Sequence, residues 1–308
     1  MSRAVVREGF GGPEVLHVRD VAEPHAGRGE VRVRVRAVGL NPLDWQLASA
    51  PGLAAAFGVP TPSGFGCDLA GVVDEVGPGV AGFAAGDRVY GGVLARAAAD
   101  HLVLPVPLPA PDVLFHTPDG IGDDTAAALP TPGLTAVAAV DAVRPRPGDI
   151  VLIGGAAGGV GVLAAQIARL RGATVLGTAS PGTFDFLRGL GVVPVAYGPG
   201  LADRATALAP GGVSAAIDLF GTETVDAALT LGVPPDRISS VAGGPTPAGV
   251  HATGAHAADP RALEQITDAI LAGTVTVPIA ESFSIDQVRD AVARQAERHT
   301  HGKIVVRP

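Results

Sequence analysis

A glycine-rich segment between a short apolar strand and a helix is the part of the chain whose spacing points most directly to chemistry. The apolar run at 150–153 leads into Gly-Gly-Ala-Ala-Gly-Gly-Val-Gly at 154–161, and a helix-compatible segment follows at 162–170. A strand, a turn and a helix in this order place backbone N–H groups where a pyrophosphate binds. Three small residues stand at the fixed positions of G-x-G-x-x-G. We therefore predict a dinucleotide site at Ala156, Gly158, Gly159, Val160 and Gly161.

The end of the next strand decides which dinucleotide the site favours. A carboxylate there binds the ribose 2′-hydroxyl of NAD, but this chain has Thr178 at that place and no acidic residue before Asp185. Ser180 and Thr183 supply hydroxyl groups for a 2′-phosphate, although the loop contains no lysine or arginine. The pattern favours NADP(H), while ordinary loop and helix-cap chemistry also explains both hydroxyls.

The composition describes a chain long enough for two domains. It has 308 residues and a formal net charge of −8, which argues against nucleic acid or an anionic membrane as the main partner. The single cysteine, Cys67, excludes an intramolecular disulfide and a four-cysteine zinc site. The apolar run at 150–168 is explained better by a nucleotide motif than by a membrane span, and no signal-peptide core precedes it. We expect a cytoplasmic protein.

Two patterns divide the chain. Up to about Pro109, short segments at 31–37, 69–76 and 88–90 read as strands separated by glycine and proline, which indicates a β-rich, partly open barrel. From Asp149, strands alternate with helices as in a doubly wound parallel sheet, so the fold class is α/β. Strands are expected at 150–154, 174–178, 193–196, 214–218 and 237–242, with helices near 160–171, 183–189, 201–208 and 222–231. After Pro260 we expect a helix to 272, a strand at 274–280, an amphipathic helix at 285–298 and a strand at 303–307.

Seven short motifs follow one another along nearly the whole chain. They lie at 10–16, 38–44, 66–73, 86–89, 126–136, the glycine turn and 302–306. Together they resemble the zinc-independent quinone oxidoreductases of the medium-chain dehydrogenase/reductase superfamily. The resemblance implies a GroES-like barrel with a Rossmann domain, NADPH as hydride donor and a homodimer. We expect residues 1–117 and 265–308 to form the catalytic domain and residues 118–264 the Rossmann NADP-binding domain.

The zinc-dependent relatives share this frame, so the metal needs its own argument. The places that match their catalytic zinc ligands hold Asn41, Cys67 and Thr131. One thiol with an amide and a hydroxyl is a poor Zn²⁺ site, so we expect no metal. Acceptors that are already electrophilic, such as quinones and activated α,β-unsaturated carbonyls, need no Lewis acid.

We expect Asn41 to lie near the nicotinamide and the acceptor, or to be only a turn residue before a proline, and we expect Asp44 to order the same turn. The resemblance assigns roles to three further residues. Thr135 lies beside the nicotinamide ribose, and Tyr197 packs on the 2′-phosphate side of the adenosine. Lys303 approaches the cofactor cleft, or only begins a strand.

Two departures from the family pattern bear on the substrate. Residues 97–101 read Ala-Ala-Ala-Asp-His, so that His101 replaces the tyrosine of the relatives. Tyr90 and His101 are the candidate proton donors, with water as an equal alternative. The loop at 47–61 is rich in alanine and poor in aromatic residues, which favours a small or aliphatic enone over a bulky quinone.

These features predict an NADPH-dependent, metal-free oxidoreductase that transfers hydride to a small-molecule quinone or activated enone. An enoyl-thioester reductase is the chemical alternative, although no basic patch for a coenzyme A or phosphopantetheine phosphate is evident. An NADPH-binding protein without turnover, either crystallin-like or redox-sensing, is compatible with the same glycine turn.

Overall fold

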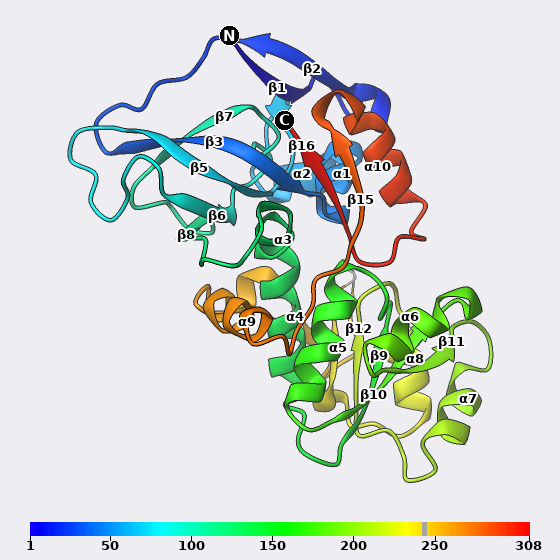
Figure 1. Cartoon of the computed structure of the whole chain (residues 1–308). Helices are drawn as coiled ribbons and strands as arrows, with labels where there is room; N and C mark the ends of the chain where they lie inside the picture. The colour runs from blue at the N-terminus through cyan, green and yellow to red at the C-terminus, as the bar shows by residue number, and fades with distance from the viewer. Residues whose placement is uncertain (242–244) are drawn as a thin grey trace. The chain divides into compact units, whose positions relative to one another are not determined.

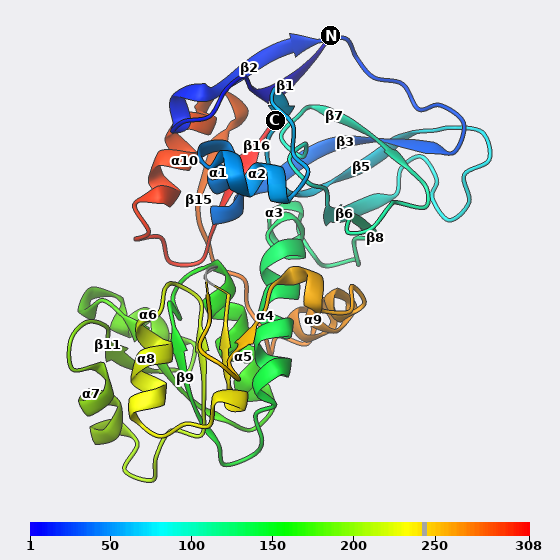
Figure 2. The same ribbon diagram turned by 180° about the vertical axis from the view of Figure 1, so that it is seen from behind.

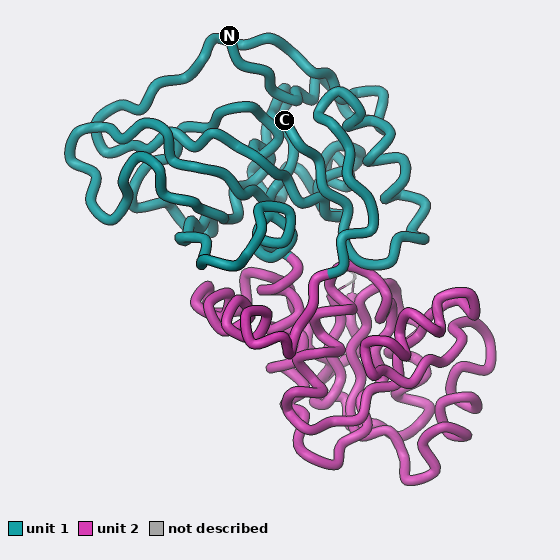
Figure 3. Tube along the Cα trace, in the orientation of Figure 1, with its two compact units in different colours: residues 1–131, 278–308 teal, residues 132–277 magenta. Residues whose placement is uncertain are grey.

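The computed structural model describes residues 1–241 and 245–308. The chain forms two compact units, unit 1 with residues 1–131 and 278–308 and unit 2 with residues 132–277 (Figure 3). Both bounds fall later in the chain than the bounds expected from the sequence. The assignment of catalysis to one domain and of cofactor binding to the other stays a prediction. Among the described residues, each helix is too short or too polar to cross a membrane.

Unit 1 consists mainly of β-strands (Figure 1). A three-stranded sheet has the order β2-β1-β4, and a seven-stranded sheet has the order β15-β16-β3-β5-β6-β8 with β7 paired to β3. The strands are β1 (Ser2–Arg7), β2 (Leu16–Val21), β3 (Glu30–Gly39), β4 (Ser63–Gly64), β5 (Asp68–Val76), β6 (Arg88–Gly92), β7 (His101–Pro105), β8 (Val113–His116), β15 (Ile279–Ser284) and β16 (Lys303–Arg307).

Strand β3 shows why this sequence forms a half-buried sheet. Val31, Val33 and Val35 are buried in the core of unit 1, while Arg34 and Arg36, which follow Val33 and Val35, are exposed. Side chains of a strand point alternately to opposite faces, so the apolar–basic alternation places every valine inward. The strands expected at 31–37, 69–76 and 88–90 are confirmed.

Helices also cover part of the segment that was expected to be a loop at 47–61. They are α1 (Pro42–Ser49) and α2 (Pro51–Ala56), and a short α3 (Asp123–Ala127) lies further on. Each of α1 and α2 begins with a proline, whose missing N–H costs nothing at a helix start. The alanines within both helices favour helix formation. The loop expectation was wrong for residues 47–49 and 51–56.

Unit 2 is a Rossmann fold with helices on both faces of its sheet (Figure 2). The strand order is β11-β10-β9-β12-β13-β14, and every pair is parallel. The strands are β9 (Ile150–Gly154), β10 (Thr174–Ala179), β11 (Val193–Ala196), β12 (Ala215–Asp218), β13 (Ile238–Ser240) and β14 (His251–Ala252). The helices are α4 (Pro130–Val143), which starts in unit 1, α5 (Gly159–Leu170), α6 (Phe184–Gly189), α7 (Leu201–Leu208), α8 (Glu223–Thr230) and α9 (Ala262–Leu271).

The sheet confirms the alternation of strands and helices expected from residue 150 onwards. Strand β13 is shorter than the strand expected at 237–242, of which position 242 lies outside the described residues. The strand order reverses between β9 and β12, because β10 and β11 lie on one side of β9 and the later strands lie on the other. Ligands of such sheets bind outside the carboxyl ends of the strands at this switch point. The glycine turn comes directly after β9 and therefore lies there.

The segment expected as a strand at 274–280 is mostly not a strand. The N–H of Thr274 donates to Ala269 at the end of α9 at 2.9 Å, and Thr276 exchanges hydrogen bonds with the Gln166 side chain of α5 at 2.8 and 2.9 Å. These bonds use the backbone groups that a sheet would need, so the strand, β15, begins only at Ile279. The next helix is α10 (Val288–Ala296), and the strand expected at 303–307 is confirmed as β16.

Candidate functional site

The glycine turn of unit 2 is held in shape by β10. Gly155 has a φ of +69°, a left-handed conformation that favours glycine, and its carbonyl oxygen accepts from Gly158 N at 3.1 Å. The Thr178 hydroxyl oxygen accepts from Gly155 N at 3.0 Å, and its carbonyl oxygen accepts from Ala156 N at 3.3 Å. Thr178 therefore supports the turn. In the sequence, this position was considered only for its effect on cofactor choice.

The glycines of the turn do different work. A Cβ on Gly161 would lie 2.2 Å from the carbonyl oxygen of Gly155, so only glycine lets helix α5 pack this closely on the turn. A Cβ on Gly158 would meet that oxygen at 3.4 Å, an ordinary contact. Ala156 fits because Gly177 faces it, since a Cβ there would lie 2.7 Å from the Ala156 methyl. The fold thus requires glycine at 161 and leaves space beside 158.

Helix α5 supplies hydrogen-bond donors next to that space. Gly158 is its N-cap, and the N–H groups of Gly159, Val160 and Gly161 lie in its first turn. N–H groups in the first turn of a helix have no acceptor within the helix, and the positive end of the helix dipole favours an anion. These residues fit the pyrophosphate of a dinucleotide, and the open space beside Gly158 is where its oxygens would lie.

The segments that follow β10, β11 and β12 add side chains at the same edge of the sheet. After β10, the hydroxyl oxygens of Ser180 and Thr183 are 2.9 Å apart. After β11, Tyr197 is 54% exposed. Phe220, which comes after β12 and is 58% exposed, lies beside Gly155, whose Cβ would be 3.4 Å from that of Phe220. Thr135 is buried in α4. The cofactor contacts predicted at these positions stay predictions.

Sequence reasoning missed Asp218 and Phe220. The buried carboxylate of Asp218, the last residue of β12, accepts backbone N–H groups of Phe220 at 3.0 Å and Gly221 at 2.9 Å. It also accepts the N–H of Thr224 at the start of α8 at 3.0 Å. An acidic residue at the carboxyl end of a predicted strand was the available signal, because such a residue can order the loop after the strand.

A second, fully buried polar cluster lies in unit 1, where three strand ends meet. Strand β3 ends at Gly39, and in the antiparallel register of β3 and β5 this residue lies opposite Asp68. Strand β16 pairs with the same end of β3, so Leu40 N donates to the carbonyl oxygen of Ile304 at 3.0 Å. Asn41, Asp68 and Lys303 are thereby brought together from distant parts of the sequence.

Both ends of the Asn41 carboxamide are engaged inside this cluster. Its Nδ2 donates to Asp68 Oδ2 at 2.9 Å and to the carbonyl oxygen of Gly39 at 3.2 Å. Its Oδ1 accepts from Lys303 Nζ at 2.7 Å. Asp68 also accepts from the Thr131 hydroxyl at 2.7 Å. The geometry makes Asn41 a connector of buried charges, and its predicted contact with nicotinamide or acceptor stays a prediction.

Asp44 stands at the start of α1 beside this cluster. Its Oδ2 accepts from Asn41 N at 2.7 Å, which is the turn-ordering role expected for it. Among the described residues, its Oδ1 has no hydrogen-bond partner. Burial raises the pKa of Asp44 to about 7, against the opposing effects of the Cys67 thiol and the Asn41 N–H.

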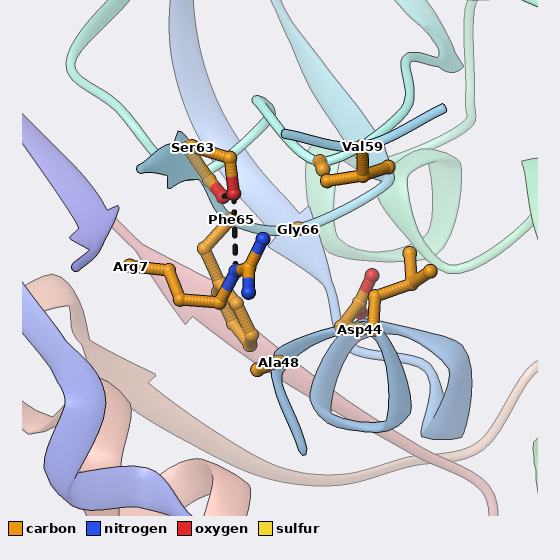
Figure 4. A pocket seen from close by; sticks show the side chains of 10 residues that line it. Arg7, Asp44, Ala48, Val59, Ser63, Phe65 and Gly66 are labelled. Carbon is orange, nitrogen blue, oxygen red and sulfur yellow. Dashed lines mark hydrogen bonds between the residues drawn. The ribbon is translucent and has the colours of Figure 1, made fainter. Parts of the chain in front are cut away.

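A small cavity lies next to Asp44 in unit 1 (Figure 4). Its volume is about 10 Å³, roughly the space of one water molecule. Asp44 from α1 and the buried Arg7 from β1 both line it, and Arg7 Nε donates to the Ser63 hydroxyl at 3.1 Å. The cavity is too small for an organic acceptor, so it belongs to the interior of the unit and not to a substrate site.

The two candidate proton donors lie elsewhere in unit 1. Tyr90 is buried in β6 with its ring 5.9 Å from that of Phe115. The His101 ring is bound at both nitrogens, with Nδ1 3.4 Å from the Ser2 hydroxyl and Nε2 3.5 Å from an Asp74 carboxylate oxygen. These contacts give His101 a structural place on β7. Proton donation by either residue stays a prediction.

Comparison with known proteins agrees with the fold of both units. Residues 27–101 match the alcohol dehydrogenase GroES-like domain, and residues 190–306 match the family described as zinc-binding dehydrogenase. The solved quinone oxidoreductase from Coxiella burnetii superposes with a TM-score of 0.85 over 100% of this chain and 99% of its own, at 28% identity. The chain belongs to the medium-chain dehydrogenase/reductase superfamily. The GroES-like and Rossmann architecture predicted from the sequence is therefore confirmed.

The chain is also similar to quinone oxidoreductases and to short parts of polyketide synthases. A quinone oxidoreductase of Pseudomonas aeruginosa is 40% identical over 183 residues, 58% of this chain and 53% of the relative. The spectinabilin polyketide synthase protein NorB of Streptomyces orinoci is 42% identical over 211 residues, 66% of this chain and 9% of the relative. The chain thus spans about half the length, or less, of these relatives. A mycobacterial protein solved with NADPH superposes at a TM-score of 0.85 over the whole of both chains, at 26% identity.

The name of the second matching family raises the question of whether the residues present fit zinc. At the places that match zinc ligands, the Asn41 amide and the Thr131 hydroxyl both donate to Asp68. The third place is Cys67, where burial raises the pKa of the thiol and so opposes the thiolate form that zinc requires. Lys303 already places a cation at Asn41 Oδ1. This donor set does not fit Zn²⁺.

Proposed function

We propose that this protein is an NADPH-dependent, metal-free oxidoreductase that transfers hydride to a quinone or an activated α,β-unsaturated carbonyl. The observation that carries the proposal is the turn before α5, which leaves open space beside Gly158 next to the first-turn N–H groups of the helix. The similarity to quinone oxidoreductases supports this choice of acceptor. A small-molecule partner, a cytoplasmic location and a homodimer belong to the same proposal.

The residues of unit 2 account for the choice of cofactor. The N–H groups of Gly159, Val160 and Gly161 bind the pyrophosphate. Ser180 is the more exposed member of the hydroxyl pair with Thr183, so we assign it to the 2′-phosphate. No carboxylate stands between positions 178 and 184 to repel that phosphate, and the similarity to a mycobacterial protein solved with NADPH supports the assignment.

The absence of a fitting metal site determines which acceptors suit the protein. NADPH supplies the hydride when it is bound, and the chain has to position the acceptor and exclude water. The polar groups of Asn41, Asp68 and Lys303 are engaged with one another. Because this cluster offers no strong electrophile to an alkoxide or a carbonyl, acceptors that are electrophilic by themselves are favoured.

Oxidation of NADPH by the purified chain with a panel of acceptors tests the proposal. We expect turnover with a compact benzoquinone or an activated enone, and no oxidation of simple primary alcohols with NADP⁺. Robust alcohol oxidation would contradict the proposed chemistry. Tight NADPH binding without turnover on any acceptor would favour a cofactor-binding protein that has no catalytic activity.

A second candidate function is reduction of an enoyl thioester. It is favoured by the 42% identity to the polyketide synthase protein NorB and the 43% identity over 178 residues to the erythronolide synthase EryA2 of Saccharopolyspora erythraea. Crotonyl-pantetheine and crotonyl-coenzyme A, assayed beside a simple enone of the same chain length, separate the two functions. A kcat/KM at least tenfold higher for a thioester would favour this second candidate.

A further inference from the structure

Lys303 is the only lysine of the chain. The sequence contains 22 lysine and arginine residues, and each of the others is arginine. The single lysine is also one of the most deeply buried charged residues, at 3% exposure. Lysine is almost never fully buried without a partner, so a chain that uses arginine elsewhere has a lysine at the place where a buried ammonium is needed.

The local geometry explains why an ammonium suits this place. Lys303 Nζ donates to the carbonyl oxygen of Leu40 at 2.5 Å and to Asn41 Oδ1 at 2.7 Å. An ammonium is compact and has three donors, whereas a guanidinium is a planar fork with five. A guanidinium here would leave more buried donors to satisfy in a site that offers these two acceptors at close range.

The backbone before Lys303 fixes where the ammonium lies. Gly302 has a φ of +94°, and a Cβ on it would lie 2.2 Å from the carbonyl oxygen of Pro278. The N–H of Lys303 donates to that same oxygen at 2.9 Å. Glycine is therefore required at 302, and it seats the start of β16 against the segment that leads into β15.

The surroundings of the ammonium are negatively charged. Burial lowers the pKa of Lys303, and the neighbouring Asp68, Asp44 and Cys67 groups oppose that shift and favour the charged form. Asp68 is buried on β5, and Asp44 is buried on α1. The cation is therefore hydrogen-bonded to the connection between β3 and α1 and lies among acidic groups of β5 and α1.

We propose that the Lys303 ammonium is the resident cation of this cluster: it fixes the Asn41 carboxamide beside Asp68 and Cys67, and its presence keeps this set of groups from taking up a metal ion. Lys303 is thus a positioning residue of unit 1 rather than a ligand of the cofactor. The proposal concerns the cluster alone, and its tests use neither NADPH nor an acceptor, so it stands or fails separately from the proposed reaction.

The first test uses the wild-type protein and the fact that it has one lysine. An amine-reactive acylating reagent has only two targets, the N-terminal amine and Lys303. We expect the native protein to be modified at the N-terminus alone, with Lys303 reacting at least 100-fold more slowly until the protein is unfolded in guanidinium chloride. Modification of Lys303 in the native protein at the rate of a free lysine would overturn the proposal.

The second test compares two variants that both remove the charge of Lys303. One also removes the volume of the side chain, and the other keeps most of it. Lys303→Ala leaves the oxygens of Leu40, Asn41 and Asp68 and the Cys67 thiol around a vacant space, whereas Lys303→Met fills that space with an apolar chain. Co²⁺ is the probe, because a cobalt–thiolate bond gives a charge-transfer absorption band. We expect Lys303→Ala to show this band and a Co²⁺-dependent rise in Tm, and wild type and Lys303→Met to show neither.

A control variant identifies the ligand. Adding Cys67→Ser to Lys303→Ala should abolish the band. A thiolate band in wild type, or equal behaviour of Lys303→Ala and Lys303→Met, would overturn the proposal. If Lys303→Ala does not fold, the wild-type Co²⁺ titration and the acylation rates still decide, because a wild-type protein that takes up one equivalent of Co²⁺ on Cys67 would contradict a resident ammonium.

Discussion

The α-carbon of Gly161 lies so close to Gly155 that a Cβ on it would be 2.2 Å from the Gly155 carbonyl oxygen. A Cβ on Gly158, three residues earlier, would lie 3.4 Å from the same carbonyl oxygen. Both positions belong to the small-residue pattern of the turn, yet the fold restricts only Gly161. The space beside Gly158 is therefore open in unit 2, and our proposal places the pyrophosphate of the cofactor there.

The first prediction rests on this difference. Gly158→Val should weaken NADPH binding at least 100-fold, because the side chain stands in the space assigned to the pyrophosphate, while Tm stays within a few degrees of wild type. Titration by NADPH fluorescence and a thermal melt measure the two effects.

The matched control is Gly161→Ala. Its methyl group collides with the Gly155 carbonyl inside the protein, so Tm should fall even without cofactor. Unchanged NADPH affinity in Gly158→Val would show that the pyrophosphate does not bind at this turn.

Cofactor preference gives the second prediction. Ser180→Asp places a carboxylate where we assign the 2′-phosphate, so it should lower the affinity for NADPH at least tenfold and change the affinity for NADH much less. Ser180→Ala is the control, because it removes the hydroxyl without adding charge and should have a smaller effect. Fluorescence titration with both cofactors measures this. Equal affinities of the wild-type protein for NADPH and NADH would contradict the assignment.

The third prediction concerns Asn41. Asn41→Ala removes one of the two acceptors of the Lys303 ammonium and a donor to Asp68, and hydrogen bonds to buried charged groups contribute about 1.5–3 kcal/mol each. We expect the free energy of unfolding to fall by about 3 kcal/mol and turnover to fall more than NADPH affinity. Urea denaturation and steady-state kinetics measure these effects.

Ser49→Ala, at an exposed position at the end of α1, is the control for Asn41, which is the N-cap residue of that helix. It should change stability by less than about 0.5 kcal/mol. Wild-type stability of Asn41→Ala would mean that the carboxamide does not connect Asp68 and Lys303.

The fourth prediction is a pH dependence that originates at Asp44. Burial raises the pKa of this carboxyl from 3.8 to about 7, so the folded protein binds its proton more tightly than the unfolded chain. The corresponding stability is complete below about pH 4 and is lost as the pH rises through about 7. Relative to Asp44→Asn, wild type should lose about 1.4 kcal/mol of stability per pH unit in this window.

Other groups titrate in the same cluster, so the comparison with Asp44→Asn matters. Cys67, Asp68 and Lys303 face Asp44 electrostatically and are present in both proteins. Asp185→Asn, whose carboxyl is 95% exposed, serves as a control and should show the wild-type slope. Urea denaturation at several pH values measures the slopes, and parallel curves for wild type and Asp44→Asn would refute the assignment.

The sequence was informative wherever structure depends on neighbours in the chain. The strand, turn and helix around Gly158 could be predicted because apolar period and glycine spacing are local properties. The helices at Pro42–Ser49 and Pro51–Ala56 were missed although the signal was local, since each begins with proline and contains helix-forming residues.

Features that depend on distant pairings could not be predicted. The segment at 274–280 looked like a strand because its bonds to Gln166 of α5 cannot be read from its own residues. Asp68 and the true surroundings of Lys303 were missed for the same reason. Both depend on the register of β3 with β5 and with β16. The pairing of β3 with β16 brings together residues that are more than 200 positions apart.

The two-piece construction of unit 1 has a consequence for the order in which the protein folds during synthesis. Residues 132–277 form unit 2 from one continuous segment, so this unit can fold while the ribosome is still translating residues 278–308. The large sheet of unit 1 lacks β16, and with it β15, until the ribosome has passed residue 307. Until then, the end of β3 is an open sheet edge and Asp68 has no ammonium nearby. We therefore expect the nascent chain to carry a folded Rossmann unit behind an unfinished barrel.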